Sequence, residues 1–149
     1  MRYSFFIICF ISFSFLAQAQ NGKKLNIDKK TVAVQGYDVV SYFSGKATMG
    51  YERIQSEYQG IKYYFASLTN KEIFDKNPEY YLPEYGGWCA YAMGIDGSKV
   101  KIDPETFKIS NNKLYLFYNF KGYNTLTPWN ENEASLKSSA DKYWDIGSN

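Results

Sequence analysis

The chain has 149 residues, of which 45% are hydrophobic and 19% aromatic, and its formal net charge is +2. That length and aromatic content suit one folded domain with a sizeable core and exclude a disordered chain. A charge so close to neutral gives no reason to expect a nucleic acid or an anionic membrane as a partner. Histidine is absent, which excludes the Ser-His and Cys-His catalytic pairs and removes the commonest zinc and copper ligand.

The first 19 residues have the pattern of a secretory signal peptide. Arg2 provides a positive start, residues 5–16 are almost continuously apolar, and Ala17-Gln18-Ala19 fits the small-x-small cleavage site. No later apolar run has spanning length, so we expect no membrane span after cleavage. We therefore expect an exported protein, periplasmic or secreted, with a signal peptide at 1–19, a flexible lead-in at 20–28 and a single domain at 29–146.

The first half of this domain alternates strand and helix signals. The pattern around Val32 and Val34 predicts a short edge strand over 30–35, and Asp38 is placed to cap a short helix over 39–43. Two strand-like runs, 51–58 and 61–67, flank Gln59-Gly60, which is typical of a tight hairpin. The next segment, 67–74, predicts a short amphipathic helix that ends before a proline.

The second half predicts another hairpin and a long helix. The runs 106–110 and 113–118 flank Asn111-Asn112, and asparagine tolerates the left-handed backbone that such a turn demands. Alternation along 114–118 indicates a strand covered on both faces. Thr127-Pro128 predicts a helix start, and the helix should continue over 131–144. The whole predicts a small single α+β domain of hairpins packed against short helices and a C-terminal helix.

The segment 85–94 holds Cys89, the only cysteine outside the first 19 residues, so an internal disulfide is excluded. Gly86-Gly87 predicts a close backbone approach or a turn with positive φ. If the following run is helical, Cys89 and Met93 share a face and offer a thiolate and a thioether, a donor pair suited to Cu(I). The alternative is that Cys89 is a small buried hydrophobe and Met93 fills a gap in the core.

Six sequence blocks, in this order along the chain, resemble the YHS domain family, specifically its exported single-domain members. The blocks are Gly36-Tyr37-Asp38 with Tyr42-Phe43, Tyr63-Tyr64-Phe65-Ala66-Ser67, Phe74 with Asn77-Pro78-Glu79-Tyr80, Tyr85-Gly86-Gly87-Trp88-Cys89-Ala90-Tyr91, Lys101-Ile102-Asp103-Pro104, and Leu114-Tyr115-Leu116 with Tyr118-Asn119. Intracellular relatives look like metal-binding modules, and their cysteines would fall on Ser41, Ala66 and Asn70. All three positions lack a thiol here, so the resemblance implies the fold more than it implies a metal site.

Two functions remain open at this point. The first is an exported soft-metal protein, with copper bound by Cys89 and Met93. The second is a non-enzymatic structural or binding module for a small molecule or a protein partner, in which Cys89 is buried and no metal binds. No two carboxylates have a spacing that identifies an acid/base pair, so the sequence favours binding over catalysis. Further binding candidates are Tyr37, Asp38, Tyr85, Trp88 and Tyr91.

Overall fold

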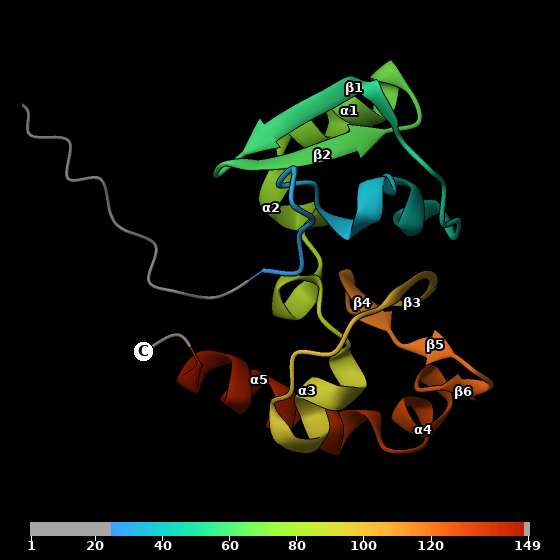
Figure 1. The fold of residues 1–149 in the computed structure, drawn as a ribbon, viewed down its shortest axis with the longest axis vertical. Coiled ribbons are helices and arrows are strands. Elements are labelled where there is room, and N and C mark those ends of the chain that lie inside the picture. The colour runs from blue at the N-terminus through green and yellow to red at the C-terminus, as the bar shows by residue number, and fades with distance from the viewer. Residues whose placement is uncertain (1–24, 148–149) are drawn as a thin grey trace, which may run out of the picture.

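The computed structural model describes residues 25–147, so the predicted signal peptide lies outside the described residues. Figure 1 shows the first part of the chain, coloured blue to green, stacked on the second part, coloured yellow to red. Three separate antiparallel pairs of strands and five α-helices make up the described chain, together with three short 3-10 helices. This arrangement confirms the α+β prediction.

The first part of the chain is built on one hairpin. Strands β1 (Tyr51–Tyr58) and β2 (Ile61–Phe65) pair antiparallel, and the turn between them has φ of 52° at Gln59 and 78° at Gly60, as predicted. The helix α1 (Leu68–Lys76) packs on this hairpin, and Ser67 caps it by accepting a hydrogen bond from the Asn70 amide. The shorter helix α2 (Pro78–Tyr81) follows directly.

The second part combines a hairpin with three helices. The predicted turn at Asn111-Asn112 joins β3 (Asp103–Ser110) to β4 (Lys113–Phe117), with both asparagines at positive φ. A two-residue pair, β5 (Asn119–Phe120) with β6 (Tyr123–Asn124), leads into α4 (Leu126–Glu131) and α5 (Glu133–Ile146). The helix α3 (Ala90–Asp96) lies against α5 (Figure 1).

Strand β4 separates two hydrophobic cores. Leu114 and Leu116 belong to the first core, which also includes Val39, Tyr42, Phe65, Phe74 and Cys89. Tyr115 and Phe117 belong to the second core, which also includes Tyr85, Ala90, Met93, Trp129, Leu136 and Ala140. The side chains of these four β4 residues are at most 1% exposed. The prediction that both faces of this strand are covered is therefore confirmed.

Two local predictions were wrong. Residues 30–35 do not form a regular strand, because Val34 and Gln35 adopt φ of 48° and 53° and the chain turns there into the 3-10 helix η1 (Val34–Gly36). Val32 instead makes one isolated parallel bridge to Lys62. The helix predicted to begin at Thr127-Pro128 begins at Leu126 and belongs to the separate helix α4. The long helix beyond it does bury Leu136 and Ala140, as predicted.

Residues 25–28, the end of the expected lead-in, lie against the folded domain. The Asn26 amide donates to the Gly86 carbonyl at 2.9 Å, and its side-chain amide donates to the Gly87 carbonyl at 2.8 Å. Leu25 and Ile27 pack on the first core. Within residues 25–147, none of the helices combines the length and the apolar character that a bilayer crossing requires.

Candidate functional site

Two buried polar side chains stand out as possible centres of a site, Asp38 in the first part of the chain and Cys89 in the second. Both are fully buried. A buried carboxylate or thiol is informative because burial of a polar group has a cost unless partners compensate it. The partners of these two groups differ, and that difference decides which of them has chemistry to offer.

Asp38 is completely occupied by hydrogen bonds within the protein. Its Oδ1 accepts from the amides of Val40 and Ser41 at 2.9 and 3.3 Å, at the start of the 3-10 helix η2 (Ser41–Ser44). Its Oδ2 accepts from the Ala66 amide at 2.9 Å and from the Asn70 side-chain amide at 2.7 Å. Asp38 therefore caps the turn that leads into η2, a 3-10 helix over Ser41–Ser44 where a helix over 39–43 was predicted, and also ties this turn to the β2–α1 connection.

The same contacts bring together the three positions that lack cysteine in this chain. Ser41 is far from Ala66 and Asn70 in sequence, yet the Ser41 and Ala66 backbone amides and the Asn70 side-chain amide all donate to the Asp38 carboxylate. The positions converge in space, and a carboxylate with its four donors fills the place between them. These residues offer no sulfur to a metal, so this cluster does not fit a soft metal ion.

The segment before Cys89 has an unusual backbone. Tyr85, Gly86 and Gly87 have φ of 54°, 61° and 82°, three left-handed residues in a row within the 3-10 helix η3 (Glu84–Gly87). A Cβ on Gly86 would lie 2.8 Å from the side chains of Leu25 and Trp144. Both halves of the glycine prediction are therefore confirmed: the turn has positive φ, and the backbone is closely approached.

Cys89 itself lies at the start of α3, where it is held by backbone contacts. Its amide donates to the Val100 carbonyl at 3.0 Å, and it forms a parallel bridge with Leu116. Its carbonyl accepts from the Met93 amide at 3.0 Å. Met93, however, belongs to the second core whereas Cys89 belongs to the first, so the two sulfur-bearing residues pack in different surroundings.

The Cys89 thiol has two polar neighbours. Its Sγ accepts a hydrogen bond from the Tyr118 amide at 3.4 Å and lies 3.4 Å from the Thr125 hydroxyl oxygen. Since the Thr125 hydroxyl donates to the Tyr118 carbonyl at 2.9 Å, the thiol proton is free to point at that hydroxyl oxygen. The neutral thiol is thus well accommodated in this arrangement.

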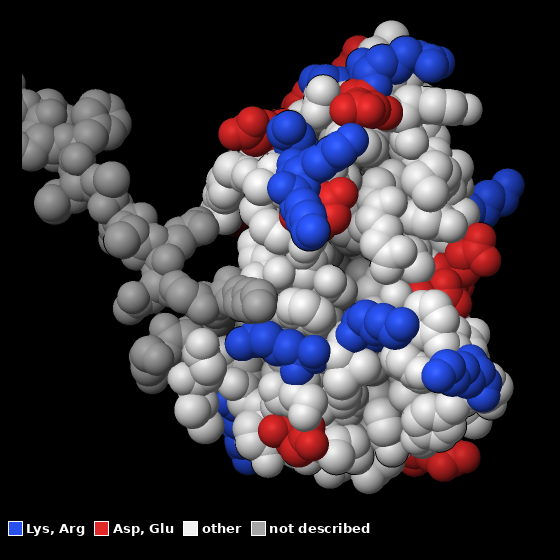
Figure 2. All heavy atoms as spheres, viewed as in Figure 1, with Lys and Arg blue, Asp and Glu red and all other residues white. Residues whose placement is uncertain are grey.

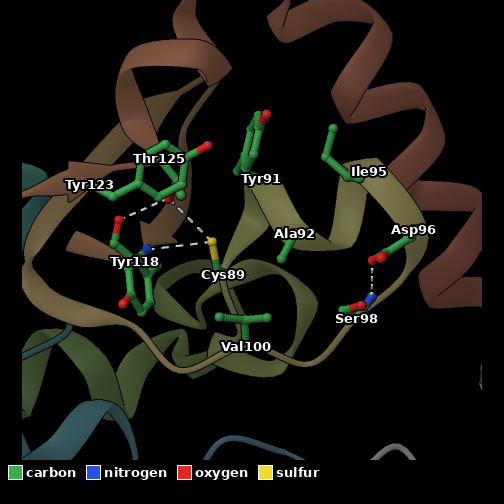
Figure 3. A pocket seen from close by; sticks show the side chains of 10 residues that line it. All are labelled: Cys89, Tyr91, Ala92, Ile95, Asp96, Ser98, Val100, Tyr118, Tyr123 and Thr125. Carbon is green, nitrogen blue, oxygen red and sulfur yellow. Dashed lines mark hydrogen bonds between the residues drawn. The ribbon is translucent and has the colours of Figure 1, made fainter. Parts of the chain in front are cut away.

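A pocket of about 380 Å³ opens beside this thiol (Figure 3). Its wall is mainly apolar and aromatic, and its lining residues are Cys89, Tyr91, Ala92, Ile95, Asp96, Ser98, Val100, Tyr118, Tyr123 and Thr125. They come from α3, from the loop after it, and from the segment around β5 and β6. A largely apolar pocket of this volume with a few polar groups suits a small organic ligand.

Of the residues proposed from the sequence, Cys89 and Tyr91 line this pocket. Tyr85 is buried elsewhere and donates to Asp141 at 2.9 Å, and burial together with this bond raises its pKa. Tyr37 donates to Glu105 at 3.4 Å at the edge of the first core. Trp88 packs against the second core. Asp38 and Met93 are likewise absent from the lining, so the structure divides the sequence candidates among several places.

Most residues that line the pocket were not predicted from the sequence. Tyr118, Tyr123 and Thr125 reach the pocket only because the chain returns to Cys89 after β4, 29 or more residues later. The alternation along β4 predicts that Tyr118 shares a face with Leu116, but nothing in the sequence places Cys89 beside that face. Among the described residues, no group of three or more His, Cys, Asp or Glu side chains could hold a metal ion.

The face shown in Figure 2 carries basic and acidic side chains interspersed with uncharged ones, and neither sign forms a continuous patch there.

Comparison with protein families matches the YHS domain to residues 40–85, which confirms the resemblance over that stretch. The match ends at Tyr85, before the first residue that lines the pocket. No curated protein and no solved structure matches the chain significantly.

Proposed function

We propose that this chain, whose residues 40–85 match the YHS domain, is a non-enzymatic binding module that takes a small molecule in the pocket beside Cys89. One observation carries the proposal, namely the pocket of about 380 Å³ with mainly apolar walls. The buried Asp38 carboxylate, by contrast, is already occupied by hydrogen bonds within the protein. The fold positions no pair of carboxylates or nucleophile with base at this pocket, and binding is the function that these walls support.

The test is a screen of small organic fragments against the folded protein by two-dimensional amide NMR. We expect ligands that shift the amides of α3 and of residues 118–125. Ala92→Phe places a ring in the pocket and should abolish these shifts. Ala134→Phe, at an exposed position of α5, is the matched control and should leave them unchanged. Fragments that bind Ala92→Phe as well as the parent chain would refute the proposal.

A second candidate is a soft-metal protein in which Cys89 binds Cu(I), with Met93 as a further ligand. The observation in its favour is that the thiol lies on the pocket wall with the Tyr118 amide directed at its sulfur, a donor that would also stabilise a thiolate. Met93 is not among the residues lining the pocket, so a metal there would find one sulfur. This donor set fits a tight site poorly.

Anaerobic Cu(I) titration against a competing chelator separates the two candidates. For a metal protein, the parent chain should bind one equivalent tightly and Cys89→Ser should bind none. Failure of both proteins to compete with the chelator would remove copper from consideration and leave the small-molecule proposal in place. A Cys89→Ser variant that still binds stoichiometric copper would show that the metal lies elsewhere.

We further propose that the protein is exported by the signal peptide at 1–19. The support is the sequence pattern of a positive start, an apolar run and a small-x-small site. Expression in a bacterial host with fractionation and intact-mass measurement tests this. The expected product outside the cytoplasm begins at Gln20, whereas a cytoplasmic protein that retains Met1 or Arg2 would contradict export.

A further inference from the structure

Three tyrosine rings lie together on one side of the pocket described above. Tyr91 comes from α3, Tyr118 lies between β4 and β5, and Tyr123 comes from β6. In Figure 3 the three rings group around one end of the pocket near Cys89, whereas Asp96 and Ser98 lie at the opposite end. Aromatic rings gathered in this way attract cations, because the face of each ring carries partial negative charge.

Asp96 adds a full negative charge at the other end of the same pocket. Its Oδ1 accepts a hydrogen bond from the Ser98 amide at 3.0 Å. Hydrogen bonds from the side chain and backbone of Ser98 lower the pKa of Asp96, so this carboxylate is ionised at neutral pH. None of the ten residues lining the pocket is a lysine or arginine.

Three lysines lie close by in the sequence and have to be accounted for. Lys99 and Lys121 are exposed to solvent and are absent from the lining. Lys101 places its ammonium group over the ring of Phe120, 4.5 Å from the centroid, and Phe120 packs against Tyr118 with centroids 5.0 Å apart. Phe120 thus already holds one cation beside Tyr118, and neither Lys101 nor Phe120 lines the pocket.

We infer that the ligand of this pocket is an organic cation with an apolar body, such as a quaternary ammonium compound. The inference rests on the proposed binding function and names its ligand class. The rings of Tyr91, Tyr118 and Tyr123 cover the cationic group, Ala92, Ile95 and Val100 cover the apolar body, and the Asp96 carboxylate supplies long-range attraction. A neutral ligand of the same shape gains only the apolar contacts.

Two probes of the same shape test this directly, namely (3-hydroxyphenyl)trimethylammonium and 3-tert-butylphenol. The first has a positively charged nitrogen where the second has a neutral carbon. Binding is measured by NMR titration at mildly acidic pH, where both phenols keep their protons and Asp96 remains ionised. We expect the cation to bind roughly tenfold more tightly, the effect of adding two or three exposed cation–π contacts. Equal affinities would overturn the inference and leave the binding function standing. If neither these probes nor any screened fragment binds, the proposed function itself fails.

Matched variants locate the effect. Asp96→Asn and Tyr123→Leu change exposed side chains, and Tyr123 is 54% exposed, so the fold should tolerate both. Each should weaken binding of the cation by about threefold to tenfold and leave binding of 3-tert-butylphenol nearly unchanged. Glu57→Gln and Tyr51→Leu are the controls, because both residues are exposed on β1, and they should change neither affinity. Equal losses for the two probes in Asp96→Asn and Tyr123→Leu would contradict the assignment.

Discussion

The buried side chains of Asp38 and Cys89 differ in how many hydrogen bonds the protein makes to them and how strong these bonds are. Asp38 uses both oxygens, each accepting two hydrogen bonds from the protein, and its carboxylate has no remaining capacity for a ligand. Cys89 has two contacts at 3.4 Å through a polarisable sulfur, and its side chain lies on the wall of a pocket. A fully satisfied group fixes the fold, whereas a weakly engaged group beside open space leaves room for binding.

If this comparison is correct, removal of the Asp38 carboxylate has the largest effect on stability. Asp38→Ala removes the carboxylate that accepts from four donors, two of them in buried and two in half-buried hydrogen bonds, and we expect the free energy of unfolding to fall by about 3 kcal/mol. Asp38→Asn keeps one acceptor oxygen and should lose less. Urea denaturation of the two variants and the parent chain provides the measurement. A loss below about 1 kcal/mol for Asp38→Ala would show that solvent replaces the carboxylate easily.

The wall of the pocket depends on how closely α3 approaches α5, and Gly94 permits that approach. A Cβ at Gly94 would lie 2.6 Å from the Leu136 carbonyl oxygen, so Gly94→Ala must move the helices apart and should cost about 2 kcal/mol. Gly147→Ala is the control, since its φ is −67° and its nearest contact is 3.3 Å, and we expect a change within about 0.5 kcal/mol. Similar denaturation midpoints for the two variants would refute the packing argument.

Cys89→Ala should have a smaller effect than either Asp38→Ala or Gly94→Ala. It removes one buried sulfur and two weak hydrogen bonds next to an existing pocket, and we expect a loss of about 1 to 2 kcal/mol in the free energy of unfolding. The comparison with Asp38→Ala in the same urea series is the critical one. If Cys89→Ala proved the more damaging substitution, Cys89 would be the structural residue and the contrast between the two regions would be reversed.

The smallest expected effect concerns acid pH and Asp141. Burial tends to raise the pKa of this carboxyl, but hydrogen bonds from Lys137 and Tyr85 outweigh burial and leave the pKa below its ordinary value. A lowered pKa in the folded state means that Asp141 stabilises the fold above its unfolded pKa and loses this contribution as the pH falls through the folded pKa. Asp141→Asn should therefore flatten the fall of the urea midpoint in acid. A slope equal to that of the parent chain would contradict this role.

Local sequence signals predicted the two hairpins and the helix over 67–74 because short-range chemistry decides them. Gln59-Gly60 and Asn111-Asn112 supply the left-handed residues that the two turns adopt, and Ser67 caps its helix through its own side chain. The edge strand predicted over 30–35 was wrong because alternation indicates which side chains are buried but does not determine the backbone dihedral angles. Val34 is buried in the first core and the Gln35 side chain donates to the Ile102 carbonyl at 3.1 Å, two tertiary contacts that the local pattern does not contain.

The candidate site was predictable only in part, for the same reason. Cys89 was identified because it is the only cysteine outside the first 19 residues, and Tyr91 because it lies in the same sequence block. Tyr118 and Tyr123 carry no local signal of their own and become part of the pocket through the pairing of β4 with the chain near Cys89. Nor does the spacing of Cys89 and Met93 reveal that β4 separates two cores and that these residues fall on different sides.

The bond from the Tyr118 amide to the Cys89 sulfur has a practical consequence. The amide proton resonance of Tyr118 responds to the electron density on that sulfur, so one assigned NMR signal reports the chemical state of the only described cysteine. Oxidation, metal coordination and a ligand resting on the thiol change that density in different directions or amounts. The protein thus carries an internal probe that needs neither a label nor a substitution at Cys89.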